Sequence, residues 1–461
     1  MLKLWRILVQ AIKGEEQDYT TGSIDRAILL LSIPMILEMA MESLFAIVDA
    51  FFVSKISTDA VATVGLTESV LTLMYSLAIG LSAAATAMVA RRVGEGDRAA
   101  AAKAGAQTIV IGLIVSTLIA IPGYYFAKDI LGLMSKDPAL VESGYRYTQL
   151  MFTANLPIFL LWMLNGIFRG AGDAATAMRA LWIANIINII LCPTLIYGFG
   201  PIPAFGVLGS GIATTIGRST GVIYQLWNLF NVGKIVRLKW AQMKPDFDII
   251  KKLLEIGAGS TGQYLISSAS WIFMIFILGQ IGKEVTAGYT IAIRIIVFTI
   301  LPSWGVANAA ATLVGQNLGA GLPERAEKSV WRACQLNLVF MTIVSVVYMV
   351  FAPALIGIFT TEAGALEAGT LGLRFLAAGY VFFGYGMILS QALNGAGNTK
   401  TPTIINFIFF WLVEIPLAWV LAMVLHWGQV GVYISIITAE TMLALAVIWA
   451  FKQGKWKMVK V

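Results

Sequence analysis

The chain has few charged side chains, and this scarcity excludes most water-soluble folds. Only 12% of its 461 residues are Asp, Glu, Lys or Arg, whereas 58% are hydrophobic. Soluble globular proteins carry about 25% charged residues, and a soluble chain of this length could not cover its surface with so few. The composition therefore indicates a protein that is embedded in a lipid bilayer.

Cysteine and histidine are also scarce, which excludes several kinds of site. Cys192 and Cys334 are far apart and each lies within or beside an apolar run, so we expect neither a disulfide bond nor a metal site. The single histidine, His426, excludes multi-histidine metal chemistry. The glycine pairs at 94–96 and 170–172 lack the Lys-Ser/Thr of a nucleotide loop. We therefore expect no enzyme and no cofactor.

Long apolar runs are the main feature that the sequence does have. Segments such as Ile109–Phe126 and Leu338–Leu355 approach the ~20 residues that cross a hydrocarbon core of about 30 Å. Backbone polar groups in lipid must be paired within their own segment, so these runs should be helices. We predict an all-α membrane protein with twelve transmembrane helices in two pseudo-symmetric six-helix lobes. The predicted spans are 26–53, 59–88, 104–126, 139–168, 177–198, 207–232, 250–279, 285–317, 327–352, 366–393, 402–425 and 429–451.

A polar stretch between residues 232 and 250 is the longest break between apolar runs, and it predicts the boundary between the lobes. An apolar face in the first residues is typical of an interfacial helix, although a frayed tail fits as well. The predicted parts are a cytoplasmic N-terminal segment at 1–25, the first lobe at 26–232, a cytoplasmic linker at 233–249, the second lobe at 250–451 and a basic cytoplasmic tail at 452–461.

The positive charges are distributed unevenly between the two sides of the predicted helices. Of the 32 Lys and Arg residues, 24 lie on the side that holds both termini, six lie on the opposite side, and Arg218 and Arg294 fall inside spans. By the positive-inside rule, both termini are expected in the cytoplasm of a multi-pass protein of the inner cell membrane. The net charge of +7 is thereby explained by topology, and we expect no nucleic-acid partner.

The two halves of the chain contain an internal repeat. Val89–Gly96 corresponds to Val314–Gly321, and Arg169–Asp173 corresponds to Asn394–Asn398, both at an offset of 225 residues. Each half has six predicted spans, an even number, so the repeats should be parallel and related by an axis along the membrane normal. Transporters place substrate sites at such repeat interfaces, although a channel or a membrane enzyme can also be duplicated.

Several ordered motifs resemble the multidrug and toxic compound extrusion (MATE) family of transporters, in particular its DinF-like prokaryotic branch. The resemblance covers residues 21 to 450 and implies a V-shaped pair of lobes that exports organic cations against a proton or sodium gradient. The glycine motifs of both halves contribute to it. The other matching segments are Thr21–Ile24, Leu31–Pro34, Val48–Val53, Asn188–Pro193 and Gly206–Thr214.

The resemblance also implies a cation site in the first lobe. The family pattern matches Asp49, Asn165, Asn188 and Thr214, but its fifth-helix aspartate is replaced here by Cys192. Sodium prefers oxygen ligands, so the thiol favours protons as the coupling ion over sodium. A seventh-helix acid of the NorM-like branch is also missing, and the nearest residue is Gln263.

The first predicted helix carries three acids on one face. Glu38, Glu42 and Asp49 are spaced by four and seven residues, which places them within roughly 40° of one another. A carboxylate at mid-bilayer costs at least about 2.5–3.5 kcal/mol, so these acids should face the protein interior or water. We expect a cation-coupling seam, in which Glu42 could supply the charge that Cys192 lacks. The alternative for Glu38 and Glu42 is a purely structural role in helix packing.

Other spans also contain charged residues, namely Glu68, Arg218, Arg294, Glu414 and Glu440. They could form structural ion pairs or contact a ligand, and the sequence does not pair them. Aromatic faces attract cations and methionines adapt to varied ligands, although most such residues face lipid or the core. We select as substrate-binding candidates Glu68, Glu414, Gln263 and Trp411.

The sequence as a whole predicts an antiporter, a monomer that exports a small organic cation or drug in exchange for inward protons, with sodium as the alternative ion. The second hypothesis is a flippase for lipid-linked saccharides or another large polar solute. A flippase would need a basic cavity for pyrophosphate, whereas the spans contain more acids than arginines. The third hypothesis is a channel without ion coupling, and the twelve-span repeat argues against it.

Overall fold

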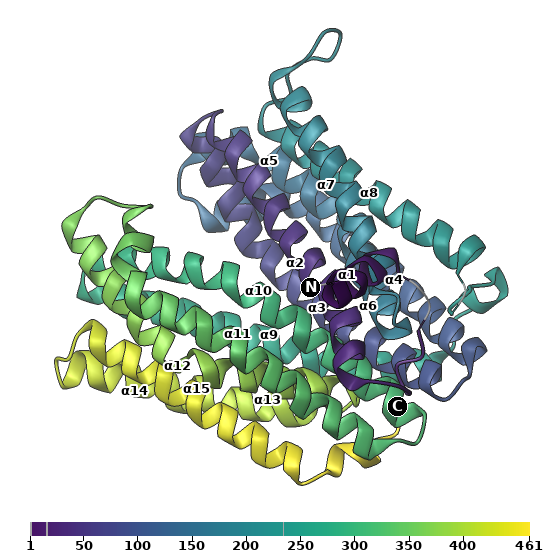
Figure 1. Cartoon of the computed structure of the whole chain (residues 1–461). Helices are drawn as coiled ribbons and strands as arrows, with labels where there is room; N and C mark the ends of the chain where they lie inside the picture. The colour runs from purple at the N-terminus through teal and green to yellow at the C-terminus, as the bar shows by residue number, and fades with distance from the viewer. Residues whose placement is uncertain (1, 15–16, 234) are drawn as a thin grey trace.

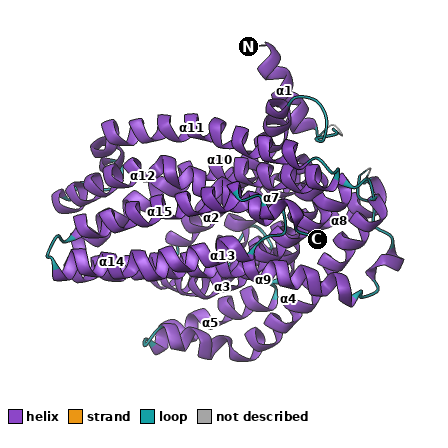
Figure 2. Ribbon diagram, turned by 90° about the horizontal axis from the view of Figure 1, so that it is seen from below, coloured by secondary structure: helices purple, strands orange, loops and turns teal. Residues whose placement is uncertain are grey.

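The computed structural model describes residues 2–14, 17–233 and 235–461, and these residues fold into helices joined by short loops (Figure 2). Parts of the predicted N-terminal segment (residues 1, 15 and 16) and of the linker (residue 234) lie outside the described residues. The described part contains one isolated β-bridge, Phe199 to Ile202, and no strand. The prediction of an all-α fold is confirmed.

The described residues of the first half form eight α-helices. Their bounds are α1 Leu2–Lys13, α2 Ile24–Ser54, α3 Thr58–Gly94, α4 Arg98–Met134, α5 Pro138–Thr153, α6 Leu156–Ala171, α7 Ala174–Tyr197 and α8 Val207–Trp227, with the π-helix η1 Asn228–Val232 after α8.

The second half repeats this arrangement with a more irregular penultimate span. Its elements are the 3-10 helix η2 Trp240–Met243, then α9 Phe247–Ile281, α10 Lys283–Gly319, α11 Pro323–Gly357, α12 Ala363–Gly395, α13 Lys400–Asn406, η3 Phe407–Glu414, α14 Ile415–Trp419, η4 Val420–Val424, α15 Gln429–Lys452 and the 3-10 helix η5 Lys455–Met458. The segments η3 and η4 are π-helical.

Eleven stretches of the described chain are long and apolar enough to cross a membrane. One of them joins α5 and α6, and another joins α13 to η4. The twelfth predicted span, 207–232, is occupied by α8 and η1. Its hydropathy is lower because it contains several Gly, Ser and Thr residues and Arg218, most of which pack inside the lobe.

The helices form two bundles, α2–α8 and α9–α15, that meet at one end and diverge toward the other (Figure 1). We call the meeting point the narrow end; it contains the C-terminus and the loops after α3, α6, α10 and α12. The opposite, wide end contains the loop between α7 and α8, at the top of Figure 1. This arrangement matches the two predicted lobes, which we call the N-lobe and the C-lobe.

The repeated glycine motifs allow the lobes to approach at the narrow end. A Cβ atom on Gly94 would lie 2.0 Å from the carbonyl oxygen of Gln316, and one on Gly319 would lie 2.1 Å from that of Arg91. The two contacts are equivalent under the 225-residue offset of the repeat, because Gly94 corresponds to Gly319 and Arg91 corresponds to Gln316. The repeat in the sequence is therefore a pseudo-twofold contact in space, and only glycine fits at its centre.

The C-terminal segment also packs at the narrow end. Trp456 in the C-terminal segment is fully buried and stacks on Phe451. Beyond it, the carbonyl oxygens of Val459 and Val461 accept hydrogen bonds from Arg91 and Arg92 of the N-lobe, at 2.8 and 2.9 Å. At the other terminus, the predicted interfacial segment forms α1, which stands at the edge of the molecule in Figure 2.

Candidate functional site

Helix α2 brings three acidic side chains into the N-lobe, as the spacing of Glu38, Glu42 and Asp49 predicts. The helix packs against α7 and α8 on one side and against α10 of the C-lobe on the other. Each of the three acids meets a different set of partners. The seam is therefore divided into separate polar clusters along α2.

Asp49 lies in a cluster of neutral hydrogen-bond donors from α7 and α8. The Thr214 hydroxyl donates to its Oδ2 at 2.8 Å, and the Asn188 amide donates to its Oδ1 at 3.4 Å. The Cys192 thiol donates to the same Oδ1 at 3.5 Å. Asn188 and Cys192 are fully buried and Thr214 is nearly so. No basic side chain forms an ion pair with Asp49 among the described residues, so a proton or a small cation is the charge it can take up.

Glu38 is fully buried and forms an ion pair near the narrow end. Arg169 reaches its Oε1 at 3.1 Å and Asn165 donates to the same oxygen at 2.9 Å. Arg169 also donates to Ser82, and Asn165 accepts a 2.5 Å hydrogen bond from Gln225. The other carboxylate oxygen, Oε2, is buried without a hydrogen-bond partner.

The position of Asn165 differs from the one that the family resemblance implies. Its amide contacts Glu38 and not Asp49, which lies eleven residues, or about 16 Å, further along α2. The four residues that the resemblance assigns to one cation site therefore do not lie together in this structure. Asn188 and Thr214 contact Asp49, whereas Asn165 contacts the ion pair of Glu38 and Arg169.

Glu42 lies between these clusters and forms the second ion pair of the N-lobe. The Arg218 guanidinium contacts its Oε1 at 2.7 Å and lies over the Phe45 ring, 4.6 Å from the ring centre. Arg218 is buried, and its Nε and Nη1 have no hydrogen-bond partner. Glu42 is thus neutralised by Arg218, a pairing that the sequence left open. Glu68 lies on the exposed face of α3, where its charge interacts with Asp49 and Arg218.

Arg169 is the residue that sequence reasoning missed, because it was assigned to the connection after the fourth span. Helix α6 continues to Ala171, so Arg169 is still helical, and it is buried. It lines a cavity of about 50 Å³ between the lobes, together with Tyr264, Trp304 and others. Its backbone oxygen also accepts a hydrogen bond from Thr312 of α10. The one available signal was its spacing of four residues from Asn165, which places both on one helix face.

Two of the substrate candidates of the C-lobe line cavities, and the third, Trp411, is half-buried at the side of the lobe. Gln263 lines a cavity of about 360 Å³ and exchanges hydrogen bonds with Asn394. Glu414 is 3% exposed and lines a smaller cavity of about 60 Å³. Trp411 instead donates to the Ile266 carbonyl and packs against Phe273 and Phe407. Arg294 is exposed on α10, with no ion pair in the described part of the chain.

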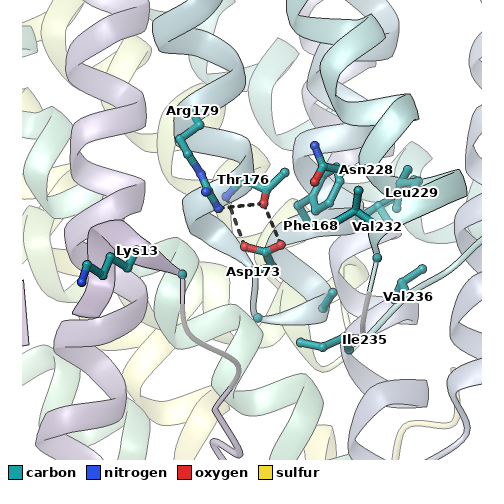
Figure 3. Close-up of a pocket in the computed structure, with 15 residues that line it drawn as sticks. Lys13, Phe168, Asp173, Thr176, Arg179, Asn228, Leu229, Val232, Ile235 and Val236 are labelled. Carbon is teal, nitrogen blue, oxygen red and sulfur yellow. Dashed lines mark hydrogen bonds between the residues drawn. The ribbon is translucent and has the colours of Figure 1, made fainter. Parts of the chain in front are cut away.

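A further cavity of about 350 Å³ lies at the narrow end of the N-lobe, between α1, α7 and η1 (Figure 3). Its charged side chains are Lys13, Asp173 and Arg179, and Thr176 lies between the last two. Asp173 accepts hydrogen bonds from the backbone and hydroxyl of Thr176 and so caps α7, while Arg179 donates to the same hydroxyl. Burial raises the pKa of the Asp173 carboxyl. Asp173, Thr176 and Arg179 thus stabilise the start of α7.

Comparison with known proteins identifies relatives along the whole chain. The sequence profile of the MatE family matches residues 34–194 and 260–420, one match in each lobe. A probable multidrug resistance protein NorM from Thermotoga maritima is 25% identical over 434 residues, which cover 94% of this chain and 93% of that protein. An FAD transporter from Shewanella oneidensis is 25% identical over 405 residues, covering 86% of this chain and 88% of the relative.

The fold of this chain is also similar to solved protein structures. A crystal structure described as MATE in the straight conformation superimposes with a TM-score of 0.88 and 26% sequence identity. The superposition covers 97% of this chain and 98% of that one. The two-lobe arrangement of α2–α8 and α9–α15 is therefore shared with a transporter of known structure.

Proposed function

The chain belongs to the MatE family, and from this premise we propose that it is an antiporter that exports organic cations, drugs among them, in exchange for inward protons. The observation that carries the proposal is Asp49, an acid inside the N-lobe whose hydrogen-bond partners are all neutral. A group of this kind can gain and lose a positive charge without breaking an ion pair. Glu38 and Glu42, in contrast, are already neutralised by arginines.

The donors around Asp49 favour protons over sodium. Thr214, Asn188 and Cys192 all point a hydrogen toward the carboxylate oxygens. Sodium would need oxygen ligands at these places, and the sulfur of Cys192 is a poor substitute. A proton needs only one carboxylate oxygen, since the remaining donors can continue to bond the other.

Sodium is the second candidate, because one observation favours it. The Oδ1 of Asn188 and the hydroxyl of Ser210 are buried without a hydrogen-bond partner. Both oxygens belong to helices that pack around Asp49. They could complete an oxygen shell around a small cation, with Asp49 and Thr214 supplying the rest.

The arrangement of the lobes supports alternating access. With both termini in the cytoplasm, as the Lys and Arg distribution favours, the wide end faces outward. A proton that enters from outside then reaches Asp49 first. Its inward movement supplies about 2.3 kcal/mol per 100 mV of membrane potential, and rocking of the two lobes about the narrow end is the conformational change that such repeats use.

The experiment is transport of a fluorescent organic cation by the purified protein in liposomes, under a pH gradient or a sodium gradient imposed separately. We expect the pH gradient alone to drive cation movement, and the sodium gradient alone to leave the rate at the protein-free background. Transport that follows sodium and ignores pH would contradict the proton proposal. An absence of gradient-driven transport in both arms would contradict antiport itself.

A further inference from the structure

The two C-lobe cavities adjoin each other and share a carboxyl group. The larger, of about 360 Å³, and the smaller, of about 60 Å³, have four lining residues in common. These are Trp271 of α9, Ile300 of α10, Phe383 of α12 and Glu440 of α15. Glu440 therefore lies at the junction, and Glu414 lies beyond it in the smaller cavity.

Neither acid has a basic partner. No Lys, Arg or His lines either cavity, and among the described residues neither Glu414 nor Glu440 forms an ion pair; Glu414 interacts only with a neutral partner, the Ser270 hydroxyl. Glu414 is 3% exposed and lines the smaller cavity, so it is a buried acid beside a cavity. Two like-charged groups beside one apolar cavity repel each other, and a bound cation would offset that repulsion.

The backbone around Glu414 is locally distorted. Glu414 is the last residue of the π-helical segment η3, and Pro416 follows in the next turn. Short π-helical segments inside α-helices frequently occur at functional sites, because the wider turn redirects side chains. This observation is independent of the acid pair and marks the same position.

The walls of the larger cavity fit a flat apolar body. Tyr264 and Trp304 stack on each other with ring centres 5.9 Å apart and planes inclined by 23°, and Trp271, Phe383 and Met387 complete the wall. Drug-sized ligands occupy cavities of about 300–1,000 Å³. Aromatic faces attract cations, and methionine adapts to varied shapes.

We infer that these two cavities form one binding site for an organic cation with a single positive charge on an aromatic body. The aromatic part lies in the larger cavity against Trp271 and Trp304, and the charged nitrogen lies at Glu440, with Glu414 behind it. The inference rests on the proposed function and assigns the cargo to the C-lobe, whereas Asp49 in the N-lobe takes the coupling ion.

The test is equilibrium binding of ethidium to the full-length protein in detergent, measured by fluorescence anisotropy in the absence of any gradient. We expect Glu440→Gln and Glu414→Gln each to raise the dissociation constant at least tenfold. Glu362→Gln, which removes an exposed carboxyl at the start of α12, is the matched control and should bind as the wild type does. Asp49→Asn should also retain binding.

A second measurement guards against a variant that is merely misfolded. Bound ethidium should quench tryptophan fluorescence, and Trp271→Phe should lose a large part of this quenching while it retains monodisperse behaviour and a melting temperature close to wild type. Unchanged affinity in both glutamine variants, or a loss of binding in Asp49→Asn alone, would overturn the inference. Intact binding without gradient-driven transport would instead contradict only the proposed function.

Discussion

The same two positions form a charged pair in the N-lobe and a neutral pair in the C-lobe. Glu38 and Arg169 make an ion pair at 3.1 Å. Their counterparts at the 225-residue offset are Gln263 and Asn394, which make an amide–amide hydrogen bond at 2.9 Å. The two halves of the repeat have kept the geometry of this contact and changed its charge.

This difference shows that the two lobes share the packing of their helices but not the placement of their charges. Gly94 and Gly319 make equivalent close contacts because both lobes must meet at the narrow end. The acids are not equivalent: Glu38, Glu42 and Asp49 of the N-lobe are paired or surrounded by donors, whereas Glu414 and Glu440 face a cavity without a counter-charge. This difference is the basis on which we propose ion coupling in the N-lobe and cargo binding in the C-lobe.

The largest expected effect on the difference between the lobes is the loss of stability caused by a substitution at Glu38. Glu38→Gln leaves the buried Arg169 guanidinium without its counter-charge, which in such pairs costs about 3–5 kcal/mol of stability. The double variant Glu38→Gln with Arg169→Asn reproduces the pair that the C-lobe already uses, so it should recover most of that loss. Thermal unfolding of the purified variants in detergent measures both effects.

The double variant is itself the control for this prediction, because it differs from the single one only in removing the orphaned charge. A single variant as stable as the wild type would show that Arg169 is adequately held by Ser82 and does not need Glu38. A double variant less stable than the single one would show that the two lobes are not interchangeable at this contact.

Substitutions at Gly94 and Gly319 test the similarity between the lobes, and we expect a smaller loss of stability from them. Gly94→Ala and Gly319→Ala should destabilise the protein by about the same amount, roughly 3 kcal/mol at the upper end of overpacking costs, since each added Cβ would meet a backbone carbonyl. Pulling the lobes apart at the narrow end should also slow transport in both variants. Melting temperature and transport rate are the measurements.

Gly96 and Gly321 provide a matched pair with a different cause. Both have a positive φ, +77° at Gly96 and +72° at Gly321, but a Cβ atom added at either position would have no other atom within 4 Å. Alanine there should cost only about 1–2 kcal/mol of backbone strain and leave transport unchanged. Unequal effects within either pair would contradict the pseudo-twofold contact.

Much of the fold follows from the sequence because lipid imposes simple rules. A long apolar run must be a helix, so the places of the twelve helices could be predicted, and the glycine motifs at one offset predicted the two-lobe repeat. The face shared by Glu38, Glu42 and Asp49 could also be predicted, since rotation within one helix is fixed by its period.

The pairing between helices could not be predicted in the same way. Arg169 reaches Glu38 across 131 residues, and that contact depends on how α6 is rotated against α2 and on three further helical residues at the end of α6. In the C-lobe, the sequence selected Gln263 and Glu414 as substrate-binding candidates, and both line cavities; the place of Glu440 beside them depends on how α15 packs against α9 and η3.

The most direct test of the account is the removal of the charge at Asp49. In liposomes with an imposed pH gradient, proton movement and efflux of a fluorescent cation are recorded together for the wild type, for Asp49→Asn and for Asp59→Asn, which alters an exposed acid at the start of α3. We predict that Asp49→Asn loses both fluxes while Asp59→Asn keeps them. Coupled fluxes at the wild-type rate in Asp49→Asn would contradict the account.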